Sequence, residues 1–170
     1  EIGIDTRVDE SGDSFEENAR LKAAAFATSS HLLSLADDSG LEVDALGGEP
    51  GVLSARYAGA DATDAERIDF LLSRLKGIPE GKRQATFKCV IAITKPEGNV
   101  HLFTGKCRGI IALKPSGECG FGYDPIFYLP QLSKTMAQLP QKEKNRISHR
   151  GRAGAKAHSF LLNLMDISRK

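Results

Sequence analysis

The stretch QATFKCVIAIT, residues 84–94, alternates apolar and polar side chains. Its odd-numbered positions from Ala85 to Ile93 are all apolar, so the spacing predicts a β-strand with one buried face. The sequence PEGN at 96–99 is typical of a tight turn, and residues 100–104 then return as a second strand. Together these segments predict a long antiparallel hairpin.

Helices and shorter strands are predicted on both sides of this hairpin. The sequences SFEE at 14–17 and TDAE at 63–66 are capping boxes, a hydroxyl followed three residues later by Glu. They predict helices that continue to about residue 28 and residue 75, and a third helix is expected from near residue 148 towards residue 167. Apolar runs predict further strands at 32–36, 109–113 and 126–129. This mixture predicts an α/β protein with a mixed sheet.

Composition narrows the class of protein. The 170 residues, 41% hydrophobic and 26% charged, suit one soluble globular domain covering residues 1–170. The net charge of +1 argues against a duplex nucleic acid partner, and no apolar run is long enough to span a membrane. No secretory signal is visible, so a cytoplasmic location is expected. The three cysteines fit no zinc pattern, and Cys89 is expected to be a buried thiol.

Two adjacent carboxylates, Asp37 and Asp38, follow the apolar run at 32–36 and precede Ser39 and Gly40. Side-by-side carboxylates repel each other unless a cation or hydrogen-bond donors offset the repulsion. A turn that caps a helix is an equally weighted explanation for these residue types. If Glu10 approaches Asp38 in space, the pair suits Mg²⁺, which prefers carboxylate oxygens together with phosphates and water.

Aromatic residues and glycines alternate in FGYDPIF, residues 121–127. Such a segment can form a flat wall on which a nucleobase stacks, with Asp124 accepting hydrogen bonds from the base or the sugar. A turn packed by its own aromatic side chains is the alternative, with about the same weight.

Basic residues gather in KNRISHR, residues 144–150, where the last helix is expected to begin. Cations oppose the helix dipole at this end, so an anionic or oxygen-rich ligand that offsets the repulsion is the favoured interpretation over a solvated charge run. Lys22, which shares a helix face with Asn18, is interpreted as a surface lysine when taken singly.

In this order the clusters resemble one family, the inosine triphosphate pyrophosphatases, which act on ITP, dITP and XTP. The resemblance spans nearly the whole chain and rests on the strings SFEENA at 14–19, ADDSGL at 36–41, ALGG at 45–48, SARY at 54–57, GFGYDPIF at 120–127 and SHRG at 148–151. It implies a long mixed β-sheet with flanking helices that form two lobes around a central cleft, usually in a homodimer.

The resemblance also implies roles for individual residues. Asp38 is similar to the general base that activates water, and Glu10 and Asp38 are similar to the carboxylates that bind Mg²⁺. Contacts with the purine nucleoside triphosphate are implied for Ser39, Phe121, Gly122, Tyr123, Asp124, Lys144, His149 and Arg150. Among these, Lys144, His149 and Arg150 are similar to residues that contact the base and set specificity.

One segment of the family pattern is not matched. Family members begin with a strand and a Thr-Gly-Asn loop, followed by a lysine, that cradles the triphosphate, whereas this sequence starts after that point. We therefore expect weak triphosphate binding and low activity; normal turnover of dITP would contradict this. A nucleotide-binding protein without catalysis and a pyrophosphatase for modified pyrimidine nucleotides are the alternative functions.

The expected reaction is hydrolysis at the α-phosphorus, with Asp38 taking a proton from the attacking water. Donors near His149 and Arg150 would suit the O6 acceptor of hypoxanthine or xanthine and disfavour the amino group of adenine. This hypothesis requires Glu10 and Asp38 to converge on one cation, in a cavity shared with the aromatic and basic residues.

Overall fold

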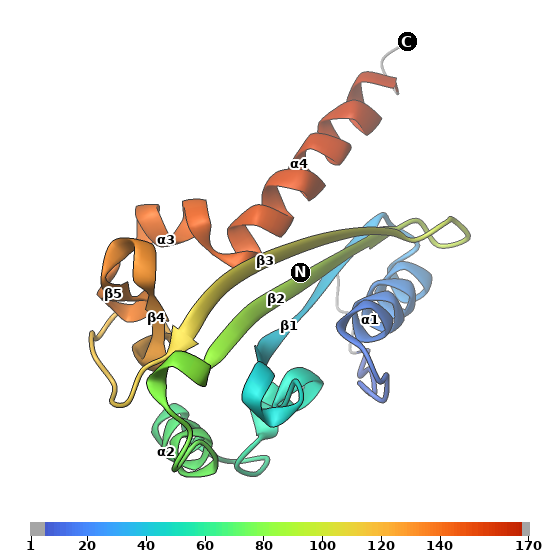
Figure 1. Ribbon diagram of the computed structural model, residues 1–170. Helices are drawn as coiled ribbons and strands as arrows, with labels where there is room; N and C mark the ends of the chain where they lie inside the picture. The colour runs from blue at the N-terminus through green and yellow to red at the C-terminus, as the bar shows by residue number, and fades with distance from the viewer. Residues whose placement is uncertain (1–5, 168–170) are drawn as a thin grey trace.

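The computed structural model describes residues 6–167 (Figure 1). In chain order its helices and strands are α1 (Phe15–Ser30), β1 (Ser34–Val43), α2 (Asp64–Arg74), β2 (Gln84–Thr94), β3 (His101–Ile111), β4 (Phe127–Leu129), β5 (Lys134–Thr135), α3 (Gln141–Ile147) and α4 (His149–Ile167). Among the described helices none combines the length and apolar character that a membrane span requires.

The five strands form one sheet in the order β1-β2-β3-β4-β5, which confirms the α/β class. Every pairing among the described strands is antiparallel. The mixed sheet that the sequence predicted is therefore not found within residues 6–167. Each strand pairs with its neighbour in sequence, and a parallel pair would need a crossover that carries the chain back to the starting edge. The predicted hairpin is confirmed as β2 and β3, with Val90 opposite Thr104.

The strands predicted at 100–104 and 109–113 are one continuous strand, β3. Close packing requires glycine at positions 105 and 109 of this strand. A Cβ at Gly105 would lie 2.1 Å from the His149 carbonyl oxygen, and one at Gly109 would lie 2.6 Å from that of Tyr128. The glycines therefore let α4 and β4 approach β3 without ending it.

Strand β1 continues through the acidic motif, which was predicted to follow the strand as a turn. All ten residues from Ser34 to Val43 pair with β2, including Asp37 with Ile91 and Asp38 with Val90. Gly40 lies inside the strand and does not turn the chain. Glycine is needed there because a Cβ would lie 2.5 Å from the Gly51 carbonyl oxygen of the 3-10 segment Gly51–Arg56. Since successive side chains of a strand point to opposite faces, Asp37 and Asp38 are separated by the sheet.

Helices α1 and α4 cover opposite faces of the sheet (Figure 1). Apolar side chains of α1 pack on Ala36, Val90 and Ala92. Residues Ala153 and Ala157 of α4 pack instead on the alternate positions Cys89, Ile91 and Ile93. The largest cluster surrounds Phe87 and Phe127 and joins α2 to β4 and the ends of β2 and β3. Cys89 is fully buried and unpaired, as predicted.

Helix starts follow the predicted caps, although α3 was not predicted. The Thr63 hydroxyl and the Glu66 carboxylate form a reciprocal capping box at α2. At α1 the Ser14 hydroxyl accepts from Glu17 N, but Glu17 reaches back to Asp13 N, so the first box is incomplete.

The presence of α3 changes the interpretation of the basic cluster. Lys144 and Arg146 lie in the last turn of α3, where cations are favourable. The dipole argument for a ligand was therefore wrong for these two residues. Only His149 and Arg150 lie at the start of a helix, α4.

Candidate active site

Glu10 and Asp38 converge on one ammonium group. The Nζ atom of Lys22 lies 2.9 Å from Glu10 Oε1 and 3.0 Å from Asp38 Oδ1. The Asn18 side-chain amide, one turn earlier on α1, donates to the other oxygen of Asp38 at 3.3 Å. The sequence missed Lys22 and Asn18 as site residues, although their spacing of four on one helix face was a usable signal.

The cluster of two carboxylates and one ammonium is left with a net negative charge. Burial raises the pKa of Asp38 above its usual value, and the ammonium of Lys22, shared with Glu10, does not fully reverse this. Burial alone would lower the pKa of Lys22, but its hydrogen bonds to Glu10 and Asp38 raise it, so Lys22 stays charged. The site thus holds an unneutralised carboxylate that is more basic than an exposed one.

The chemistry of these two carboxylates fits a Mg²⁺ ion. Their oxygens already share one cation, and hard oxygen ligands from one or two carboxylates are typical of magnesium sites that use substrate phosphates and water as further ligands. Within residues 6–167 no group of three or more His, Cys, Asp or Glu side chains is placed to hold a metal.

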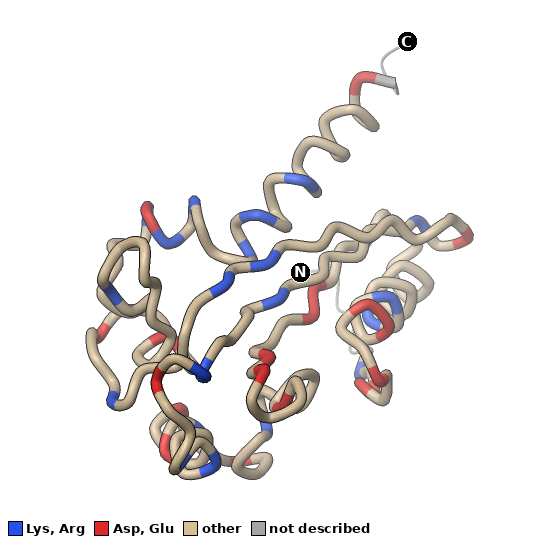
Figure 2. The backbone as a smooth tube through the Cα atoms, viewed as in Figure 1, with Lys and Arg blue, Asp and Glu red and all other residues tan. Residues whose placement is uncertain are grey.

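Asp37 and Ser39 lie on the other face of β1. Asp37 Oδ2 accepts from Ser39 Oγ at 2.9 Å and from Arg150 Nε at 3.3 Å. The repulsion expected between Asp37 and Asp38 does not arise, because each carboxylate has its own cation on its own face. Figure 2 shows negative residues along β1 and a positive residue on the neighbouring strand β2.

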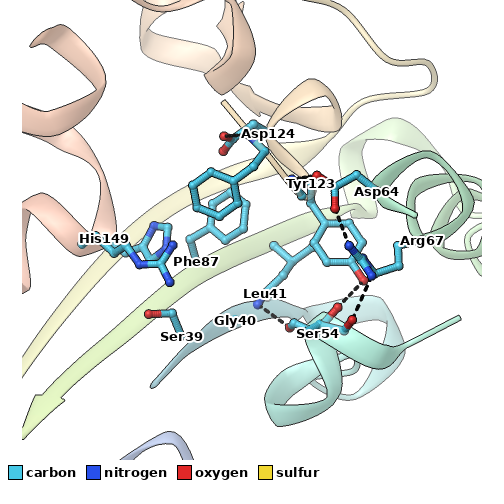
Figure 3. Close-up of a pocket in the computed structure, with 14 residues that line it drawn as sticks. Ser39, Gly40, Leu41, Ser54, Asp64, Arg67, Phe87, Tyr123, Asp124 and His149 are labelled. Carbon is cyan, nitrogen blue, oxygen red and sulfur yellow. Dashed lines mark hydrogen bonds and ion pairs between the residues drawn. The ribbon is translucent and has the colours of Figure 1, made fainter. Parts of the chain in front are cut away.

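A pocket of about 180 Å³ opens on the Ser39 side of the sheet (Figure 3). Its walls come from β1, β2, α2, the aromatic loop and the start of α4. The lining residues are Ser39, Gly40, Leu41, Ser54, Ala55, Asp64, Arg67, Phe87, Phe121, Gly122, Tyr123, Asp124, His149 and Arg150. The sequence missed those from β2, α2 and the 3-10 segment, because they carry no motif that marks them as ligand contacts.

Glu10, Lys22 and Asp38 are not among the residues that line this pocket. The two halves are nevertheless adjacent, since Asp38 and Ser39 are consecutive residues of β1. β1 pairs only with β2 among the described strands and therefore forms an edge of the sheet.

The residues of the aromatic loop at 121–124 differ in exposure and in the contacts that they make. Phe121 is 58% exposed, and the cations of Lys144 and Arg150 lie 4.8 and 5.2 Å from its ring centre. Tyr123 is buried, and its hydroxyl donates to the Ser54 carbonyl at 3.0 Å. Phe121 is thus the exposed aromatic surface of this loop, whereas Tyr123 anchors it.

Asp124 and Lys144 form a buried ion pair. Asp124 also accepts from Phe121 N at 2.9 Å. A Cβ at Gly120 would lie 2.1 Å from the Asp124 carboxylate, so glycine is required beside the pair. Because both side chains are engaged inside the protein, their contacts hold the loop in shape.

His149 is buried in the pocket wall and stacks on Phe87, with ring centres 4.7 Å apart and an angle of 17° between the planes. Burial lowers the pKa of His149 to about 4, and the charges of Arg150 and Lys144 contribute in the same direction. Its Nδ1 atom is buried without a hydrogen-bond partner among the described residues. At neutral pH the pocket therefore contains an uncharged imidazole with an unused polar atom.

The buried imidazole predicts a loss of stability in acid. Between pH 6.5 and 4 the unfolded chain binds a proton on His149 that the folded protein does not, so stability falls as pH falls through this window. The full effect is about 3 kcal/mol below pH 4. Urea unfolding from pH 7 to pH 4 should show a weaker pH dependence in His149→Phe than in the parent. The exposed His158→Phe is the control, and equal slopes in all three proteins would contradict the prediction.

Comparison with known proteins shows which family this chain belongs to. A model described as Ham1 family matches residues 1–160. The chain belongs to the Ham1 family. This confirms the resemblance inferred from the sequence strings, because related Ham1 sequences carry the name dITP/XTP pyrophosphatase.

Three similar proteins illustrate how close these Ham1 relatives are. The dITP/XTP pyrophosphatase of Desulforamulus reducens is 51% identical over 159 residues, 94% of this chain and 79% of that protein. The dITP/XTP pyrophosphatase of Bacillus subtilis is 48% identical over 161 residues, 95% of this chain and 81% of that protein. The solved Staphylococcus aureus Ham1 protein superposes with a TM-score of 0.89 at 48% identity, covering 94% of this chain and 82% of that one.

Proposed function

We propose that this Ham1 protein hydrolyses the nonstandard purine nucleotides ITP, dITP and XTP to the monophosphate and pyrophosphate. The dITP/XTP pyrophosphatase names of relatives about half identical to this chain support the substrate class. The structural observation that carries the proposal is that Glu10 and Asp38 both form salt bridges with Lys22, beside a pocket on the other face of β1.

Mg²⁺ is part of this proposal, with Glu10 and Asp38 as its protein ligands. When bound, the ion would neutralise phosphate charge and stabilise the leaving pyrophosphate. Lys22 adds a positive charge at the same place, because its ammonium is held between the two carboxylates.

Asp38 is proposed as the general base. Its side chain is mostly buried, Asn18 fixes one of its oxygens, and burial raises its pKa, which makes the carboxylate a better proton acceptor. In the reaction a water oxygen bonds to the α-phosphorus, its proton passes to Asp38, and the bond to the bridging oxygen of pyrophosphate breaks.

The base is proposed to bind in the pocket near His149 and Arg150, with Phe121 at its exposed side. Hypoxanthine and xanthine present an acceptor at O6, which suits the guanidinium of Arg150 and an N–H of neutral His149. Adenine presents an amino group there, which would face donors and leave them unpaired. Such a mismatch costs about 1–3 kcal/mol for each buried group left unpaired. Ser39, oriented by Asp37, is proposed as a further contact.

A pyrophosphate-release assay with Mg²⁺ tests the function. We expect ITP, dITP and XTP to be hydrolysed with kcat/KM at least about tenfold above that of ATP, from one mismatched buried group. Equal turnover of ATP and ITP would refute the base-reading role of His149 and Arg150. Binding of ITP without pyrophosphate release would refute catalysis, and preference for modified pyrimidine nucleotides would refute the substrate class.

The homodimer implied by the resemblance and the cytoplasmic location expected from the sequence belong to the same proposal. The proposed substrate is a small molecule from the nucleotide pool. Neither a nucleic acid nor a membrane is proposed as a partner. Light scattering of the purified protein checks the homodimer through the measured mass.

A further inference from the structure

The aromatic loop that forms one wall of the pocket is attached to three other elements. Lys144 of α3 pairs with Asp124, and Tyr123 donates to Ser54 in the 3-10 segment. The third attachment crosses from α2, where Asp64 Oδ2 accepts from the backbone N–H of Gly122 at 2.6 Å. It holds the backbone of the residue next to Phe121, whereas the cations of Lys144 and Arg150 lie over the Phe121 ring itself.

Asp64 divides its two oxygens between the loop and α2. While Oδ2 binds Gly122, Oδ1 pairs with Arg67 one turn later. The N–H of Gly122 and the guanidinium of Arg67 both lower the pKa of Asp64, so the carboxylate stays charged. A charged acceptor makes a stronger hydrogen bond to an amide than a neutral one.

Arg67, which pairs with Asp64, also binds the wall of the pocket that contains Ala55. Its guanidinium donates to the carbonyl of Ala55 at 2.9 Å and also to that of Ala62. Figure 3 shows Arg67 between Asp64 and Ser54. The Thr63 capping box fixes the first turn of α2 and therefore the direction of both side chains. Through Asp64 and Arg67, the start of α2 spans the pocket from Ala55 to Gly122.

We propose that Asp64 is a positioning residue for the nucleoside base, which through the Gly122 amide holds Phe121 at the exposed side of the pocket. The inference rests on the proposed function and adds a residue to it. Phe121 is mostly exposed and borders the pocket, so its place depends on the backbone beside it as well as on the cations of Lys144 and Arg150 over its ring. Gly122 has φ +60°, and a Cβ added there would meet nothing within 4 Å, so no neighbour packs against this side of Gly122.

The hydrogen bond between Asp64 and Gly122 should matter less for the stability of the fold than for binding of the base. The Asp64 side chain is 45% exposed, and ion pairs at such positions contribute little to stability. The buried attachments through Lys144 and Tyr123 remain when Asp64 is removed. The loss should therefore appear in the binding of the base and leave the phosphate side, on the other face of β1, unaffected.

Kinetics of Asp64→Ala test the proposal. We expect KM for ITP to rise about tenfold, as for one lost charge-assisted hydrogen bond, with kcat nearly unchanged. The inhibition constant of inorganic tripolyphosphate, which has no base, should stay at the parent value. Asp64→Asn retains an acceptor oxygen and should recover most of the affinity. Asp69→Ala, an exposed carboxylate of the same helix, is the matched control and should behave as the parent.

Two outcomes would overturn the inference. One is an unchanged KM for ITP in Asp64→Ala, and the other is an equal loss for ITP and tripolyphosphate, which indicates a general structural effect. Hydrogen exchange of the Gly122 amide needs no nucleotide and should be faster in Asp64→Ala than in Asp69→Ala. A parent protein that fails to bind ITP would refute the proposed function, whereas equal exchange rates would refute the hold of Asp64 on the loop.

Discussion

Replacing Asp38 by asparagine is expected to lower kcat for ITP by about a thousandfold, the range of general-base effects. The amide has nearly the shape of the carboxylate but cannot accept the proton of the attacking water. Its oxygen can still accept from Lys22 or Asn18, so KM should change little. The fold should also persist, because burial already disfavours the charge of Asp38.

Asp37→Asn is the matched control for this variant. The residue is adjacent and chemically identical, but it lies on the other face of β1 beside Arg150 and Ser39. We expect Asp37→Asn to act on KM through these contacts and to keep most of kcat. Steady-state pyrophosphate release and thermal unfolding of both variants provide the comparison. An Asp38→Asn protein with the parent kcat would remove Asp38 from the role of base.

Replacing Lys22 by methionine is expected to reduce both stability and activity. The variant keeps the length of the side chain but leaves Glu10 and Asp38 converging without a cation. Breaking such a partly buried cluster should lower the free energy of unfolding by about 2 kcal/mol. We also expect kcat/KM for ITP to fall about a hundredfold, since a positive charge beside the triphosphate is lost.

Mg²⁺ should distinguish this role from a general effect of lost charge. In Lys22→Met the two bare carboxylates are available to the ion, so Mg²⁺ should raise Tm more than it does in the parent. Arg20→Met removes an exposed cation of the same helix and should respond to Mg²⁺ as the parent does. An equal rise in Tm for all three proteins would show that Glu10 and Asp38 are not the metal ligands.

Secondary structure was predictable where neighbouring residues decide it. Alternation at 84–94 and the cap at Thr63 gave a strand and a helix start that the structure confirms. The same local rules failed at Gly40 and Gly105, which occur inside strands because other backbone segments pack directly on them. They also missed α3, since a helix of seven residues has too few turns to show a clear apolar period.

The sequence by itself determined the α/β class and the family, and the family resemblance implied the approach of Glu10 to Asp38. Only the tertiary structure decided that Lys22 joins those two carboxylates, that Asp37 turns away to Arg150, and that the pocket lies on the opposite side of β1 from Asp38. Local patterns encode the period of a strand or helix, whereas these contacts join distant residues. They depend on α1 and α4 packing against opposite faces of one sheet, and that packing is set by the buried apolar surfaces of the whole chain.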